Sequence, residues 1–156
     1  MTTSKTNTPR NFNGSIAIIR ASAKDNADGI AIVEHKLPFG YAPPLHVHKT
    51  QDEVFHILCG RLRFEVGGKI FVGQSGDILT APKGVPHRFI VESADGAHAL
   101  TITAGNDFEN FVTESSPPLL MEVRGALPAP TAKDLEAAAK AATNNNIDLL
   151  GPPLAA

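Results

Sequence analysis

Cysteine, long apolar runs and excess charge are all scarce in this chain, and each scarcity excludes a class of protein. Cys59 is the only cysteine among 156 residues, so an internal disulfide is impossible, and we expect its thiol to be a small buried group. No apolar run approaches the length of about 18 residues that a membrane-spanning helix needs. A net charge of −2, with lysine and arginine scattered along the chain, gives no continuous basic surface. We therefore expect neither a nucleic-acid partner nor a membrane.

The first residues, MTTSKTNTPRNFNG, are polar and contain no apolar segment of the kind found in secretory signals. We therefore expect a cytoplasmic protein with a flexible N-terminal segment over residues 1–12. A hydrophobic fraction of 42% with 19% charged residues is ordinary for one globular domain of this length.

From residue 15 to residue 103 the chain consists of short β-prone runs separated by glycine, proline and aspartate, a pattern typical of an all-β barrel or sandwich. In RLRFEV, for example, Leu62, Phe64 and Val66 alternate with charged residues, which predicts a half-buried strand. The pair Gly67-Gly68 then predicts a tight hairpin turn. The predicted strands cover 15–20, 30–36, 45–48, 54–59, 62–66, 69–72, 77–81, 87–92 and 97–103.

The C-terminal third has a different character. Phe108, Phe111 and Val112 have the spacing of a short amphipathic helix over one barrel end. A proline-rich linker follows, and then an alanine-rich helix over about 132–142, which Thr131 and Asp134 can cap. The closing IDLLGPPL is an apolar strip that we expect to dock on the barrel or on a second subunit.

The residues that indicate chemistry lie in GYAPPLHVHKTQDEVFHILCG. His46 and His48 are two residues apart, so in a strand both imidazoles project from the same face. Glu53 has the wrong parity for a straight strand. We therefore predict a turn at 49–52 that brings Glu53 to the histidines from the neighbouring strand. His87, which follows a turn rich in glycine and proline, is the candidate fourth ligand.

Three imidazoles and a carboxylate, without a thiolate, suit one divalent transition metal such as iron, manganese, nickel, cobalt, copper or zinc. The other histidines, His35, His56 and His98, fit no metal-binding pattern, and we expect them to be structural or solvated.

These two segments resemble the paired motifs of the cupin superfamily. The first motif is matched by Gly40, His46, His48, Glu53 and Gly60, and the second by Gly76, Pro82, Gly84 and His87. Val91 stands where the family usually has asparagine, which is not among the family's metal ligands. The resemblance implies a cupin double-stranded β-helix, or jelly-roll barrel, over residues 13–104. A helical and proline-rich extension, 105–156, would pack on that barrel.

The tail resembles that of single-domain cupins called quercetin dioxygenase-like. This narrower resemblance implies a metal-dependent dioxygenase that acts on an aromatic or enol-like small molecule, with Glu53 as a metal ligand that can also accept a substrate proton. Two alternatives stay open: a non-catalytic binding module, and an isomerase or lyase of sugars or keto acids. Family habit and the apolar tail also suggest a homodimer. The aromatic residues that are candidates for the substrate pocket are Tyr41, Phe55, Phe64, Phe89, Phe108 and Phe111.

Overall fold

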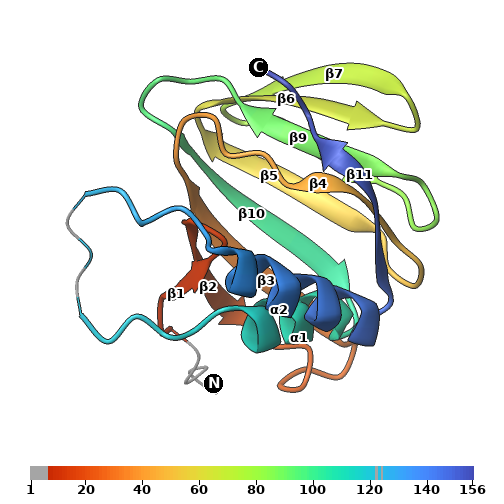
Figure 1. Cartoon of the computed structure of the whole chain (residues 1–156). Coiled ribbons are helices and arrows are strands. Elements are labelled where there is room, and N and C mark those ends of the chain that lie inside the picture. The colour runs from red at the N-terminus through yellow and green to blue at the C-terminus, as the bar shows by residue number, and fades with distance from the viewer. Residues whose placement is uncertain (1–6, 122, 124) are drawn as a thin grey trace.

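The computed structural model describes residues 7–121, 123 and 125–156, and it places these in two antiparallel sheets with helices at one end (Figure 1). The six-stranded sheet has the order β1-β2-β3-β10-β5-β8 and the five-stranded sheet the order β11-β4-β9-β6-β7. The predicted all-β fold class is confirmed. The strands are β1 (Arg10–Phe12), β2 (Ser15–Ala21), β3 (Ile30–Leu37), β4 (Pro44–His48), β5 (Glu53–Cys59), β6 (Arg61–Val66), β7 (Lys69–Gln74), β8 (Ile78–Ala81), β9 (His87–Val91), β10 (Ala97–Ala104) and β11 (Ile147–Pro153).

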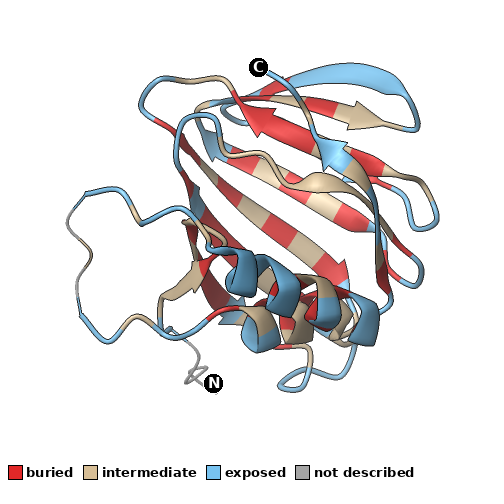
Figure 2. Cartoon of the chain, viewed as in Figure 1, coloured by how far each residue is buried: buried red, intermediate tan, exposed pale blue. Residues whose placement is uncertain are grey.

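The alternation of apolar and polar residues decides which face of each strand is buried. Along β6, for instance, Leu62 and Phe64 are buried while their neighbours are more exposed, as their parity predicts (Figure 2). The β6–β7 hairpin turns through Gly67 and Gly68, whose φ angles of 58° and 76° are the positive values that glycine allows. Between the sheets, β5, β6 and β9 contribute Phe55, Phe64, Phe89 and their neighbours to one hydrophobic core.

The helices cover one end of the sheets. Helix α1 (Asp107–Ser115) and helix α2 (Ala132–Asn144) both lie where the sequence predicts a helix. At the start of α2, Asp134 donates its backbone N–H to the hydroxyl of Thr131 at 3.2 Å and its carboxylate accepts the Thr131 N–H at 2.7 Å, so the predicted capping box is confirmed. Phe108 and Val112 of α1 pack with Phe12 of β1 in a second core.

The N-terminal end of the chain differs from the sequence-based expectation, whereas the C-terminal strip docks on the barrel as expected. Residues 1–6 of the segment predicted to be flexible lie outside the described residues, while Arg10–Phe12 of the same segment form β1, which pairs with β2. At the other end, the predicted apolar strip forms the strand β11, which pairs antiparallel with β4. Cys59, predicted to be buried, is exposed at the end of β5. Within the described residues no helix is both long and apolar enough to cross a membrane.

Candidate metal centre

His46, His48, Glu53 and His87 converge, although they come from three strands in two sheets. His46 and His48 lie on β4, where His46 is directly opposite His87 of β9 in the five-stranded sheet. Glu53 begins β5, which belongs to the six-stranded sheet. The predicted turn after β4 is present, but the prediction that Glu53 comes from a strand next to β4 is wrong. The chain crosses between the sheets at 49–52, so the carboxylate meets the imidazoles from across the barrel.

The four side chains are close enough to share one ion. Each offers a ligand atom, and these atoms all lie within 4.8 Å of one another. The Oε2 atom of Glu53 lies 2.8 Å from Nε2 of His87 and 3.4 Å from Nε2 of His48. Since metal–nitrogen and metal–oxygen bonds are about 2.0–2.2 Å long, ligand atoms on opposite sides of an ion are about 4 Å apart. An ion therefore requires only small shifts of these side chains.

The outer hydrogen bonds orient two of the rings for metal binding. Nδ1 of His46 lies 2.7 Å from the carbonyl oxygen of Pro44, and Nδ1 of His87 lies 3.1 Å from that of Val85. A carbonyl can only accept, so each Nδ1 carries a proton. On the neutral ring of His46 this leaves a lone pair on Nε2 for a metal, whereas Nε2 of His87 faces the Glu53 carboxylate, where a metal ion would take the place of a proton.

His48 supplies the clearest sign that an ion belongs here. It is 2% exposed, yet neither of its ring nitrogens has a hydrogen-bond partner among the described residues. Buried nitrogens without a partner are rare in folded proteins. A ligand bond to a cation would satisfy one of these nitrogens, so the cluster passes this test as a candidate site for a divalent metal.

The electrostatics of the cluster centre on the Glu53–His87 pair. Burial alone would raise the pKa of Glu53, but the nearby imidazoles of His48 and His87 lower it to about 2. For His87, burial opposes the charged form, but the hydrogen bond to Glu53 outweighs it and raises the pKa above the ordinary 6.5. Burial lowers the pKa of His46 to about 4. Without metal, the cluster therefore holds an ionised Glu53 that favours a proton on the facing His87, and metal binding competes with that proton.

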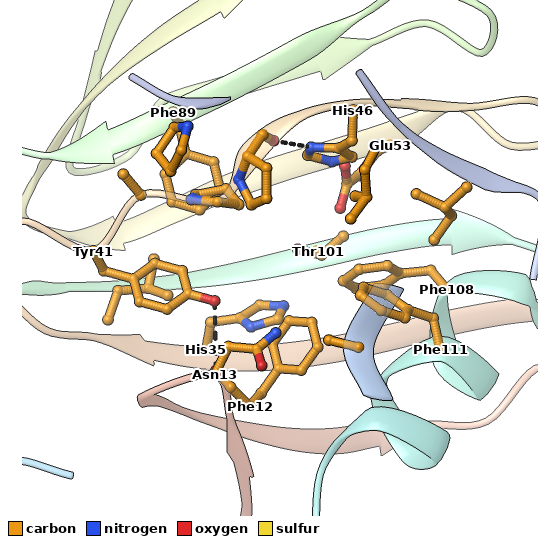
Figure 3. A pocket seen from close by; sticks show the side chains of 18 of the residues that line it. Phe12, Asn13, His35, Tyr41, His46, Glu53, Phe89, Thr101, Phe108 and Phe111 are labelled. Atoms are coloured by element: carbon orange, nitrogen blue, oxygen red, sulfur yellow. Dashed lines mark hydrogen bonds between the residues drawn. The ribbon is translucent and has the colours of Figure 1, made fainter. Parts of the chain in front are cut away.

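A cavity of about 540 Å³ opens onto this cluster, and His46 and Glu53 form part of its wall (Figure 3). This volume is in the usual range for a site that encloses one small molecule. Both sheets contribute to the lining, and so does the C-terminal extension through Leu135 and Ala138 of α2 and Leu149 of β11. The site is thus completed by a segment far along the chain from its metal ligands.

Five of the six aromatic residues predicted for the pocket line this cavity, namely Tyr41, Phe55, Phe89, Phe108 and Phe111. Phe64 does not, in contrast to the prediction. Its ring packs behind the wall, with its centroid 5.2 Å from that of Phe55 and 5.5 Å from that of Phe89. Phe64 faces inward as its parity requires, but those two rings stand between it and the cavity.

The sequence-based reasoning missed two lining residues that carry polar nitrogen atoms, His35 and Asn13. A signal for His35 was present, because it shares strand parity with Val33 and Leu37, which are buried on the inward face of β3. No comparable signal marks Asn13, which reaches the cavity only because β1 pairs with β2.

Comparison with known proteins agrees with this arrangement. The family model described as a cupin domain matches residues 33–103, a range that contains all four clustered side chains. Residues 33–103 form a cupin domain. A solved structure from Thermotoga maritima, described as a predicted oxalate decarboxylase, superimposes with a TM-score of 0.57 at 23% identity, over 66% of this chain and 96% of the other. This likeness supports the jelly-roll fold and no particular reaction.

Two curated relatives of this cupin are dioxygenases. Quercetin 2,3-dioxygenase of Bacillus subtilis (strain 168) is 33% identical over 82 residues, which are 53% of this chain and 24% of the relative. Acireductone dioxygenase of Macaca mulatta is 33% identical over 84 residues, covering 50% of this chain and 45% of the relative. The match therefore spans less than half of either relative, so it supports a metal-binding cupin and a possible enzyme without specifying a reaction.

Proposed function

We propose that this cupin is a metal-dependent dioxygenase that acts on an aromatic or enol-like small molecule. The observation that carries the proposal is that the metal cluster and the aromatic cavity share a wall: His46 and Glu53 belong to both. A molecule held in the cavity would therefore lie directly against the metal-binding residues. Both curated relatives are also named as dioxygenases, which supports the same reaction class.

His46, His48, Glu53 and His87 would hold the ion, and iron, manganese, nickel, cobalt, copper or zinc suits this donor set. When bound, such an ion supplies a Lewis acid that polarises and orients an oxygen substituent of the substrate. The buried positions of His48 and His87, 2% and 1% exposed, keep solvent away from the rear of the cluster.

The chain's own residues would prepare the substrate in two ways. The phenyl rings of Phe55, Phe89 and Phe108 form an apolar wall that excludes water and fits a flat ring. The Glu53 carboxylate lies in the cavity wall, where it would be placed to accept the proton of an enol. Because the neighbouring imidazoles lower its pKa to about 2, it is a weak base, and the transfer requires an enol made more acidic by its contact with the metal site. Transfer of that proton would leave an electron-rich enolate, the form of the substrate that dioxygen attacks.

Oxygen consumption by metal-loaded protein tests the proposal. Protein stripped with a chelator is reloaded with each candidate ion separately and supplied with a panel of flavonols, simple phenols and acyclic enols under air. We expect oxygen uptake with at least one ion and an enolic substrate, and none with stripped protein. Stoichiometric metal binding without oxygen uptake across the whole panel would contradict the dioxygenase and favour a non-catalytic binding protein.

A further inference from the structure

The wall of the cavity contains a second histidine, His35, that the metal cluster does not use. His35 lies on β3, and its direct neighbours across the sheet are Ala17 of β2 and Ala99 of β10. Both neighbours have small side chains, and His35 itself lines the cavity. The rings of Phe12 and Phe108 lie near it, with centroids 6.2 Å and 6.0 Å away.

The imidazole of His35 has an unused hydrogen-bonding atom. The residue is 6% exposed, and its Nε2 has no hydrogen-bond partner among the residues that the structure describes. Burial lowers its pKa to about 4, so the ring is neutral at physiological pH and each nitrogen can donate or accept according to the tautomer. A histidine that served only to fill the core would be expected to pair this nitrogen.

Two further polar residues, Tyr41 and Asn13, line the same cavity. The Tyr41 hydroxyl donates a long hydrogen bond of 3.4 Å to the carbonyl of Phe12, and burial raises the pKa of Tyr41 to about 12, so the hydroxyl stays protonated. Asn13 follows Phe12 in the Asn13-Gly14 turn between β1 and β2, where its φ is 51°. Figure 3 shows His35, Tyr41 and Asn13 on the opposite side of the cavity from His46 and Glu53.

We propose that His35, Tyr41 and Asn13 form a second polar binding point, which hydrogen-bonds an uncharged oxygen substituent at the end of the ligand remote from His46 and Glu53. This inference rests on the proposed function and narrows its substrate class. The ligand is a neutral aromatic molecule with oxygen substituents at two ends, one toward the metal cluster and one toward His35.

The composition of the wall explains why this substituent is uncharged. No lysine or arginine is found among the described residues that line the cavity. A carboxylate or phosphate would be buried there without a cation, which is strongly unfavourable. A phenolic hydroxyl or a carbonyl requires only a single hydrogen bond, which the His35 imidazole can supply, as can the Tyr41 hydroxyl in exchange for its long bond to the Phe12 carbonyl.

Two flavonol probes test the inference by binding. Quercetin carries hydroxyls on both outer rings, whereas 3-hydroxyflavone carries the same enol and no outer hydroxyl. Both are titrated by fluorescence into zinc-loaded protein in the absence of dioxygen, so that turnover cannot occur. We expect wild-type protein to bind quercetin at least about fivefold more tightly, the effect of one net hydrogen bond.

The variants assign that preference to particular atoms. His35→Leu should abolish the preference while leaving the affinity for 3-hydroxyflavone within about twofold, since apolar packing is retained. His35→Gln should restore part of the preference, and Tyr41→Phe should weaken it. His56→Gln, on the outward face of β5, is the matched control and should bind both probes as wild type does.

The possible failures are distinguishable. Equal affinity of wild-type protein for the two probes, or a folded His35→Leu variant that keeps the preference, overturns the second binding point and leaves the proposed function standing. If His35→Leu does not fold, the other two variants decide. A preference for quercetin over 3-hydroxyflavone that is as large in Tyr41→Phe and in His35→Gln as in wild type overturns the second binding point. Failure of wild-type protein to bind either probe overturns the second binding point, whereas the proposed function is decided separately by oxygen uptake across the wider substrate panel.

Discussion

The substitution Glu53→Gln is the sharpest test of the metal cluster, because it removes one charge and almost no volume. The residue is 2% exposed, and its carboxylate lies 2.8 Å from Nε2 of His87, where it favours the protonated imidazole. A neutral glutamine cannot stabilise a charged imidazole to the same extent. The pKa of His87 should therefore fall below its ordinary value of 6.5, because burial then dominates.

The size of the effect follows from the kind of contact that is lost. A hydrogen bond to a charged group contributes about 2 kcal/mol. We therefore expect stripped Glu53→Gln protein at pH 7 to be less stable by about 2 kcal/mol, which lowers the melting temperature of a domain of this size by about 4–8 °C. Loss of a direct ligand should also weaken metal binding by more than about 100-fold, since outer-sphere partners alone contribute 10–100-fold.

Thermal unfolding with a chelator, metal titration and NMR titration of the histidines measure these three effects. Glu92→Gln is the matched control, because Glu92 accepts hydrogen bonds from Arg61 and Arg63 at a partly exposed position outside the cavity. It should lose at most about 1 kcal/mol and bind metal normally. The reasoning is refuted if Glu53→Gln keeps its metal affinity within tenfold of wild type, or if it unfolds at no lower temperature than Glu92→Gln.

Further predictions concern the cluster, its pH dependence and the outer surface. His48→Leu should abolish tight metal binding. The stripped variant should be at least as stable as wild type, because the substitution removes two buried nitrogens without hydrogen-bond partners. A melting temperature below that of wild type in the presence of chelator would contradict the stability prediction. Acidification from pH 6.5 to 4 should destabilise the stripped protein, because the pKa of His46 is lowered to about 4 in the folded state. The loss is up to about 1.4 kcal/mol per pH unit for each histidine whose pKa is lowered in this way. Urea titrations across this range would show a constant free energy of unfolding if the reasoning is wrong. The raised pKa of His87 has the opposite effect on protein stability, because it contributes stability below pH 6.5 that is lost at higher pH. Protons also compete with the metal for His87, so metal affinity should decline as pH falls through a value above 6.5, which calorimetry at several pH values can check. Phe71 and Ile78 are exposed apolar residues on the edge strands β7 and β8, so we expect a second copy of the chain to cover them; light scattering should show a dimer that Phe71→Glu dissociates, and a monomeric wild-type protein would exclude it.

Much of this cupin is determined by local sequence. Strand alternation placed Leu62 and Phe64 on the buried face, Gly67-Gly68 marked the hairpin turn, and Thr131 with Asp134 marked the start of α2. The spacing of His46 and His48 fixed their common orientation for the same reason. Each of these features depends on residues a few positions apart, whose relative directions the backbone geometry sets.

Other features were decided only by the tertiary structure. Glu53 reaches the histidines from the opposite sheet, β11 completes the cavity beside β4, and Phe55 and Phe89 separate Phe64 from it. The two alanines that lie beside His35 likewise come from other strands. These arrangements follow from how strands distant in sequence pair and pack, and side-chain parity within a single strand carries no information about which distant strand will face it.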